Sequence, residues 1–391
     1  MVRIAVGLAY RQLTHRGAKL VGALMGVSVA IVLMFTQLGF QGALYDSAVS
    51  ASRAFDADII LTSSEFQTMA FPWPWMPRHL LDDARGVPGV ASGAPFYATT
   101  LQVTNPRDGR NLTSWLFAFA PDAPVFKSRD INSQIATIRL PDTAIIDTNS
   151  RNEIGLIAAK AHDTGRVDVE LPSAVRSVQP VMKLEGTFKI GPTINVDGNI
   201  ITSDLNYYRL LAVPLDRVSL GIVRVAQGFD PVAVKQAIEQ RLGSKARVFL
   251  KEGFIRNEMK FYSEDTPIGF IFDAGLLVGV IVGIVFISQV LHGIVSDNMR
   301  EYATLRAMGY KQVFFVILVS AIAIAIALIT YVPSAIVSFF VYDLAASATK
   351  LPMVMKPSYM IEVFLLVVTM GMVATFLSTK KLKQADPVDL F

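Results

Sequence analysis

The sequence has no cysteine and is poor in charged residues. Of its 391 residues, 17% are charged and 52% are hydrophobic, and the formal net charge is only +4. Without cysteine the chain forms no disulfide and no thiolate metal site, and so small a charge excess does not indicate a nucleic-acid partner. With a mean hydropathy of +0.45, the chain is too apolar for an ordinary soluble domain of this length. Part of it is therefore expected to lie in a lipid membrane.

The motifs that mark common enzymes are also absent. There is no H-E-x-x-H zinc motif and no G-x-S-x-G nucleophile turn. The four histidines are not at ligand spacing; they are His15, His79, His162 and His292. The G-x-x-x-x-G-K-[ST] loop that cradles ATP phosphates is missing as well. We therefore expect no catalytic residue, no metal site and no cofactor in this chain, so that any ATP-driven work needs a separate ATPase that binds ATP and magnesium.

Long apolar runs are what the sequence has in abundance. Four blocks are each about 20 residues or more, which is enough for a helix to cross a bilayer. They cover residues 20–43, 267–295, 313–342 and 359–379. The expected fold class is an α-helical integral membrane protein with four transmembrane helices. Asp273 and Glu362 lie near the ends of their blocks, where water and headgroups reach a carboxylate, so the sequence assigns them no role.

Basic residues gather in three segments and predict the orientation of the chain, because short cytoplasmic loops are enriched in lysine and arginine. These segments are residues 1–19, 296–312 and 380–391. We expect them, and with them both termini, on the cytoplasmic side of a bacterial inner membrane. Residues 44–266 and the short loop 343–358 then lie in the periplasm.

The large outer segment, residues 44–266, has the content of a folded domain. Alternating or β-branched runs predict strands at residues 58–62, 97–104, 143–147, 222–225 and 246–250. Asn105 to Gly109 reads as a hairpin loop, and residues 231–242 have the period of a short amphipathic helix. The segment is therefore expected to form an α+β domain, with residues 45–55 and 254–265 as helical stalks that continue the first two spans.

Glycines recur every four residues in two of the spans. Gly22 and Gly26 are in the first span, and Gly275, Gly279 and Gly283 are in the second. Glycines at this spacing line one face of a helix and let another backbone approach closely. We expect these five residues to mark helix contacts.

The loop between the second and third spans contains the most specific motif. Residues 297–310 read DNMREYATLRAMGY, and they resemble the E-x-A-x-L-[RK]-A-[ML]-G signature of MacB/FtsX-type ABC transporter permeases. In that family the segment is a short coupling helix that lies in a groove of the ATPase. The resemblance implies that seven residues couple the chain to an ATPase: Arg300, Glu301, Tyr302, Leu305, Arg306, Met308 and Gly309.

Other segments extend the resemblance over most of the chain and are similar to the DevC subgroup, the permeases of heterocyst-glycolipid exporters. They are residues 55–59, 186–191, 197–199, 201–204, 266–272 and 385–387. The resemblance implies the type VII-like, MacB-like permease architecture, with one span, a large periplasmic domain and three more spans. MacB fuses its ATPase to the permease, and this sequence departs from it by lacking that domain.

The family mechanism implies a set of partners. These are a separate ABC ATPase similar to DevA or to the nucleotide-binding domain of MacB, a periplasmic membrane-fusion adaptor, a TolC-like outer-membrane channel and a second copy of the chain. ATP-driven motion would reach the periplasmic domains and drive efflux of an unassigned substrate. Two other functions stay open: FtsX-like regulation of a periplasmic hydrolase and LolC/LolE-like release of lipoproteins.

The predicted topology is testable in a chain that has no cysteine of its own. Cysteines introduced at Ser150 and Ser347 should react with an impermeant thiol reagent in intact cells, whereas one at Ser296 should react only after lysis. Labelling of position 296 alone in intact cells would reverse the orientation.

Overall fold

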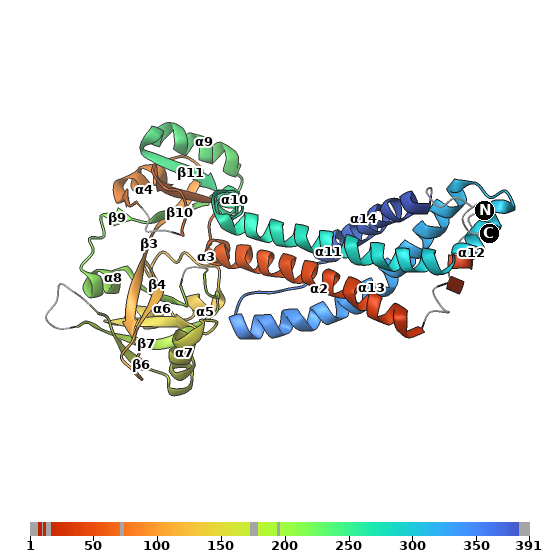
Figure 1. The fold of residues 1–391 in the computed structure, drawn as a ribbon. Coiled ribbons are helices and arrows are strands. Elements are labelled where there is room, and N and C mark those ends of the chain that lie inside the picture. Colours follow the sequence, from red (N-terminus) through yellow and green to blue (C-terminus); the bar gives the residue numbers. More distant parts are fainter. Residues whose placement is uncertain are drawn as a thin grey trace. The chain divides into compact units, whose positions relative to one another are not determined.

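The computed structural model describes residues 7–9, 11–12, 17–70, 74–172, 179–193 and 196–382 (Figure 1). The chain divides into two compact units. One unit contains residues 1–43, 267–346 and 353–391, and the other contains residues 44–266 together with 347–352. We describe each unit by itself.

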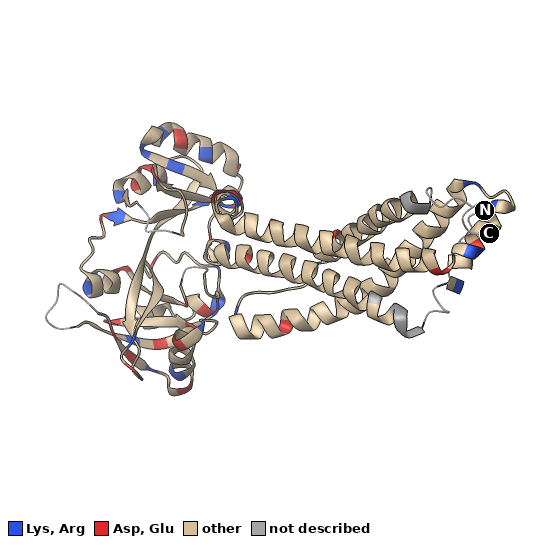
Figure 2. Ribbon diagram, in the orientation of Figure 1, with Lys and Arg blue, Asp and Glu red and all other residues tan. Residues whose placement is uncertain are grey.

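The first unit is built from four long apolar helices, which confirms the expected fold class. They are α2 (Gly17–Ala48), α11 (Pro267–Asp297), α13 (Gln312–Thr349) and α14 (Pro357–Leu382). Each contains a stretch long and apolar enough to cross a membrane. Figure 2 shows that charged residues are sparse along these helices and reappear around the short helix α12 (Met299–Ala307).

Small side chains and internal hydrogen bonds hold the four helices together. Ser334 of α13 donates its hydroxyl to the carbonyl of Ser28 in α2, at 3.3 Å. The hydroxyl of Tyr342, also in α13, donates to the carbonyl of Phe35 in α2. Between α13 and α14, Tyr331 donates to the carbonyl of a residue near the start of α14 at 2.8 Å. Such bonds matter in lipid because no water competes for the groups involved.

A mixed β-sheet forms the centre of the second unit. Among the described residues it has nine strands in the order β11-β1-β10-β3-β4-β8-β5-β7-β6. Their bounds are β1 Ile59–Ser63, β3 Val90–Thr104, β4 Asn111–Phe119, β5 Thr143–Asp147, β6 Val167–Glu170, β7 Val181–Phe188, β8 Asn199–Ser203, β10 Leu220–Val225 and β11 Ala246–Leu250. The β4/β8 and β5/β7 pairs are parallel and the other pairs are antiparallel. A separate two-stranded ladder joins β2 (Met76–Pro77) to β9 (Arg217–Val218).

Short helices cover both faces of this sheet, which explains why strands such as β5 and β8 are buried along their whole length. On one face lie α4 (Arg78–Arg85), α7 (Asn152–Thr164), α8 (Asp204–Leu211) and α9 (Pro231–Leu242). On the other lie α3 (Ser50–Ala54), α5 (Arg129–Asn132), α6 (Ile135–Arg139) and α10 (Lys251–Lys260). A five-residue π-helix, Phe261–Asp265, follows α10.

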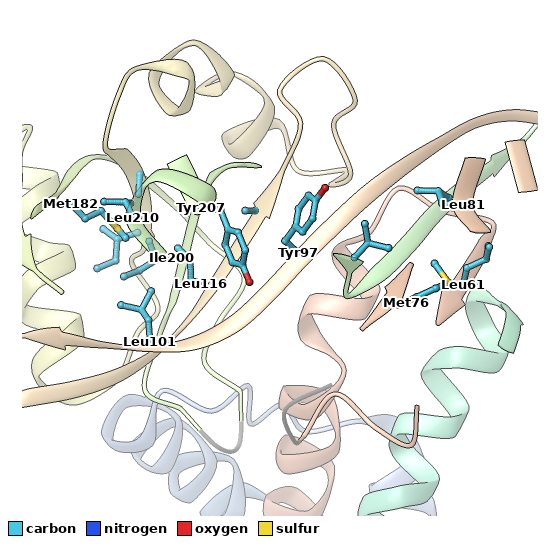
Figure 3. Close-up of a cluster of buried hydrophobic side chains, with 14 of the residues drawn as sticks. Leu61, Met76, Leu81, Tyr97, Leu101, Leu116, Met182, Ile200, Tyr207 and Leu210 are labelled. Atoms are coloured by element: carbon cyan, nitrogen blue, oxygen red, sulfur yellow. The ribbon is translucent and has the colours of Figure 1, made fainter. Parts of the chain in front are cut away.

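Strand β3 connects the two halves of the sheet. Its first part pairs with β10 and its second part with β4, and Phe96 pairs with a residue on each side. Beside it, the ring of Tyr97 lies 5.6 Å from the ring of Tyr207 in α8, and the hydroxyl of Tyr97 donates to the carbonyl of Leu215 at 3.0 Å (Figure 3). The hydrophobic core therefore continues across the sheet.

The secondary structure expected for this unit agrees with the observed elements at several places. The run 143–147 forms β5, the run 246–250 forms β11, and residues 231–242 form α9. The turn at Asn105 to Gly109 joins β3 to β4, and Gly109 has a φ of +73°. Residues 45–55 contain the end of α2 and all of α3, and residues 254–265 contain most of α10 and the π-helix.

One labelling position chosen from the sequence is unsuitable. The side chain of Ser150 is 2% exposed, and its hydroxyl donates to the carbonyl of Asp147 at 2.6 Å. A thiol there would not meet an aqueous reagent. Lys160, on the exposed side of α7, takes its place in the topology experiment.

Glu258 of α10 is a fully buried carboxyl group. Its Oε2 atom accepts hydrogen bonds from the Thr68 hydroxyl and the Met69 amide, both at 2.9 Å. Its Oε1 atom has no hydrogen-bond partner among the described residues. Burial raises the pKa of Glu258 from 4.5 to about 7, although the two hydrogen bonds act in the opposite direction. The group thus fastens the loop after β1 to α10 at the cost of holding a proton.

This pKa predicts a pH dependence of stability. Because the folded chain binds the Glu258 proton more tightly than the unfolded chain, the free energy of unfolding should fall as pH rises between 4.5 and about 7. The loss should be on the order of 3 kcal/mol. Urea titrations followed by tryptophan fluorescence would measure it, and Glu258→Gln should flatten the pH profile. The exposed Glu252→Gln is the matched control, and an unchanged profile in Glu258→Gln would assign the effect to another group.

Candidate functional site

The short helix α12 lies between two of the long helices, and all seven residues of the sequence motif are in it or directly after it. Helix α11 ends at Asp297, and α12 begins at Met299. Asn298 separates them, and its side-chain amide donates to the carbonyl of Ile294 at 2.7 Å. Helix α13 follows from Gln312. A short helix connected in this way moves with the two long helices beside it.

Gly309 ends α12. It has a φ of +94°, a left-handed conformation in which a side chain would be strained. The amide of Gly309 donates to the carbonyl of Arg306 at 3.0 Å, and the amide of Tyr310 donates to the carbonyl of Leu305 at 3.2 Å. This pair of bonds is a Schellman motif. The glycine of the motif is therefore required by the backbone and not by a contact with another protein.

Tyr302 attaches α12 to the rest of its unit. Its side chain is 2% exposed, and its ring packs edge-on against Phe315 of α13 at 5.8 Å. Its hydroxyl donates to the Gln12 side-chain carbonyl at 2.8 Å. The Gln12 amide in turn donates to Glu301 at 3.4 Å. We had expected Tyr302 to present apolar surface to an ATPase, and its burial changes that assignment: it supports the helix from beneath.

The opposite side of α12 is open. Arg300, Glu301, Arg306 and Met308 are exposed, and Leu305 is half-buried. A groove of about 530 Å³ runs beside them. Its lining is mostly apolar and includes Arg11 and Glu301; the residues are Gly7, Leu8, Arg11, Glu301, Thr304, Leu305, Met308 and Phe314. The surface thus combines charges of both signs with apolar side chains.

Sequence reasoning missed the part that the N-terminal segment plays in this site. Leu8, Arg11 and Gln12 stand at helical spacing, and the described residues 7–9 and 11–12 are helical. Gln12 is 7% exposed and contacts residues almost 290 positions away. The spacing of a leucine and a glutamine on one helix face was the available signal, but it names no partner.

Four of the five marked glycines lie where helices come close together. A Cβ atom added at Gly26 of α2 would lie 2.5 Å from the Phe286 ring of α11, and one added at Gly279 would lie 2.9 Å from Met34 Cγ of α2. Gly275 faces Gln37 of α2 in the same manner, and Gly283 faces Met370 of α14. Gly22 has no heavy atom within 4 Å of such a position. These contacts are internal to one chain.

Acidic and metal-binding chemistry is sparse in the described residues. The exposed Asp273 accepts a hydrogen bond from Gln41 at 3.2 Å, which ties α11 to α2. No three His, Asp or Glu side chains of the described part of the chain are grouped so that they could hold a metal ion. The strongest local feature of the helical unit is therefore the α12 surface.

Comparison with known proteins points to one family for this part of the chain. Residues 274–387 match the family description "FtsX-like permease C-terminal", a range that includes α12, α13 and most of α11 and α14. No curated protein matches the sequence.

Two solved structures are similar to about half of the chain. One is the extracellular domain of the noncanonic ABC-type transporter YknZ from Gram-positive bacteria, with a TM-score of 0.32, 11% identity, 49% of this chain covered and 98% of that one. The other is the periplasmic region of MacB from Actinobacillus actinomycetemcomitans, with a TM-score of 0.31, 7% identity and coverages of 51% and 92%.

The contact at Gly279 predicts a difference between two substitutions in α11. Gly279→Leu should destabilise the helical unit by about 1–3 kcal/mol, because the new side chain overlaps Met34. Leu277→Ala, at a position 59% exposed, should change it little. Unfolding in mixed micelles of increasing dodecyl sulfate content would compare them. Equal stabilities would show that the α2 and α11 backbones do not need to approach here.

Proposed function

We propose that the chain is the permease subunit of an ABC transporter and that α12 is the element by which a separate ATPase moves it. The observation that carries this proposal is the construction of α12. Its inner side is anchored by Tyr302, its end is fixed by Gly309, and its outer side presents Arg300, Glu301 and Arg306 beside an apolar groove. The match of residues 274–387 to the FtsX-like permease description supports the same assignment.

Charged and apolar groups have different parts in this contact. Glu301 and Arg306 can exchange charge-assisted hydrogen bonds with an ATPase surface, and Met308, 64% exposed, can bury its side chain there together with Leu305. Tyr302 makes no contact with the partner in this arrangement. It resists the load, because a helix seated on a buried ring and a hydrogen bond cannot tilt without breaking both.

Motion applied to α12 has a direct route along the chain. Asn298 alone separates α12 from α11, and α11 begins at Pro267, two residues after the π-helix that follows α10. Close glycine contacts between α2 and α11 leave little free space for a substrate path at that contact. We propose that the helices transmit motion to the domain formed by residues 44–266, which acts outside the membrane.

The finer assignment follows the family resemblance. We propose that the α12 end faces the bacterial cytoplasm, that both termini lie there, and that two copies of the chain work with two ATPase subunits. In the exporter function that we favour, a periplasmic adaptor and a TolC-like channel receive the substrate, as in a DevC-type system. Regulation of a hydrolase or release of lipoproteins would use the same coupling helix with other outer partners.

The double substitution Glu301→Arg and Leu305→Asp tests the coupling role. Neither position lies in a membrane-spanning stretch, so insertion and folded yield should stay unchanged. Permease-stimulated ATP hydrolysis should fall to the basal rate of the ATPase that co-purifies with the unaltered chain, and capture of that ATPase should weaken by at least about tenfold.

A matched control places the same chemistry on the exposed side of α7. Asp163→Arg with Leu156→Asp should leave both readouts unchanged, since these positions are exposed and distant in sequence from α12. Normal ATPase capture and stimulation by the Glu301→Arg/Leu305→Asp chain would remove α12 as the coupling element.

A further inference from the structure

Strand β11 forms one end of the large sheet, and its outer edge carries no strand. It pairs with β1 from Ala246 to Leu250, and none of the other strands in the described residues adjoins it. In an antiparallel strand every second residue directs its backbone amide and carbonyl away from the paired neighbour. An edge of this kind can accept another extended chain.

The edge lies in a groove between two helices. Helix α9 packs on one face of the sheet, where Val234 and Ile238 join the core cluster that contains Val248. Helix α10 packs on the other face, where Phe254 lies 5.8 Å from the ring of Phe249. Both helices contact β11 (Figure 1). The open edge between them is the floor of a groove of about 590 Å³.

Two glycines leave this groove free of side chains at its walls. Gly243 ends α9 and Gly253 is in the first turn of α10, and both line the groove. A Cβ atom added at either position would have no heavy atom within 4 Å. The backbone of an added strand, which sits about 4.8 Å from its neighbour, therefore has room beside β11.

The walls carry an excess of positive charge. Lys235 is paired with Glu239 across one helical turn at 2.6 Å, so these two lining residues cancel. Arg247 and Arg256 also line the groove. Arg247 donates to the carbonyl of Phe66 at 2.6 Å, which fixes its guanidinium over the Phe249 ring, 4.9 Å from the centroid. Arg256 is exposed and forms no ion pair with any described residue.

We propose that the β11 edge is a docking site for an extended, acidic segment of a partner protein, which joins the sheet as an additional strand. Backbone hydrogen bonds to β11 would supply affinity. Carboxylates of the segment would meet Arg247 and Arg256, and alternate apolar residues would cover the groove floor beside Phe249. This partner is additional to the ATPase that we assign to α12, and the proposal does not depend on that assignment.

The charge distribution disfavours a second copy of the chain as the occupant. Two β11 strands paired antiparallel across a two-fold axis would bring each Arg247 toward the arginines of the other strand. Like charges placed opposite one another in a ladder are destabilising. A segment rich in Asp or Glu has the opposite charge and avoids this repulsion.

The test uses the full-length chain in nanodiscs and a synthetic probe. The probe is an eight-residue peptide of alternating Glu and Val with blocked ends and a fluorescent label, and its affinity is measured by anisotropy. Binding should weaken by about tenfold when alternate backbone amides of the probe are N-methylated, because the ladder loses its donors while the charges remain. A peptide with Lys in place of Glu should not bind.

Two substitutions test the site itself. Gly253→Leu fills the groove from a helical position with open space around it, so it should abolish binding and leave the fold intact. Arg256→Glu should weaken binding at least about tenfold, whereas Lys160→Glu, the same reversal on the exposed side of α7, should not. Equal affinity for the N-methylated probe would reduce the contact to charge attraction and overturn the proposal. Loss of association between copies of the chain in Gly253→Leu, with probe binding unchanged, would assign the edge to a second copy instead.

Discussion

Helices in lipid cannot be held together by the hydrophobic effect, because the surrounding lipid is as apolar as their side chains. This constraint explains most of what distinguishes the helical unit. Close approach replaces burial at Gly26 and Gly279, where any side chain would overlap the neighbouring helix. Hydroxyl groups of Ser334 and Tyr342 bond to carbonyls of α2, where water is absent. The remaining apolar surface faces outward, as at Phe270 and Phe340.

The same constraint makes α12 unlike the helices on either side of it. A helix of nine residues is too short to be stable by itself, so its position depends on Tyr302 beneath it and on the turn at Gly309. The motif thus contains two kinds of residue. Tyr302 and Gly309 build the element, while Glu301, Arg306 and Met308 are available to a partner. A sequence signature alone does not separate these two groups.

Much of the fold could be predicted where local signals are strong. Helix α9 begins after Asp230, whose side chain caps the helix, and has Pro231 at its first position, and both are local start signals. The turn after β3 contains Gly109 at a positive φ. The position of Tyr302 could not be predicted, because its partner Gln12 is 290 residues away and no local pattern links them. Gly22 and Gly26 share one register, yet only Gly26 meets a neighbour; spacing gives the face of a helix but not the extent of its contact.

Strand β3 has a mechanical consequence. At about 3.3 Å per residue, its 15 residues form a continuous backbone of roughly 50 Å. The β10 and β4 ladders lie on opposite sides of it and meet at Phe96. A pull along the strand direction loads these ladders in shear, so that many hydrogen bonds must fail together before the two halves of the sheet can slide apart. The domain can therefore bear tension along β3 with little extension, as a stiff lever does.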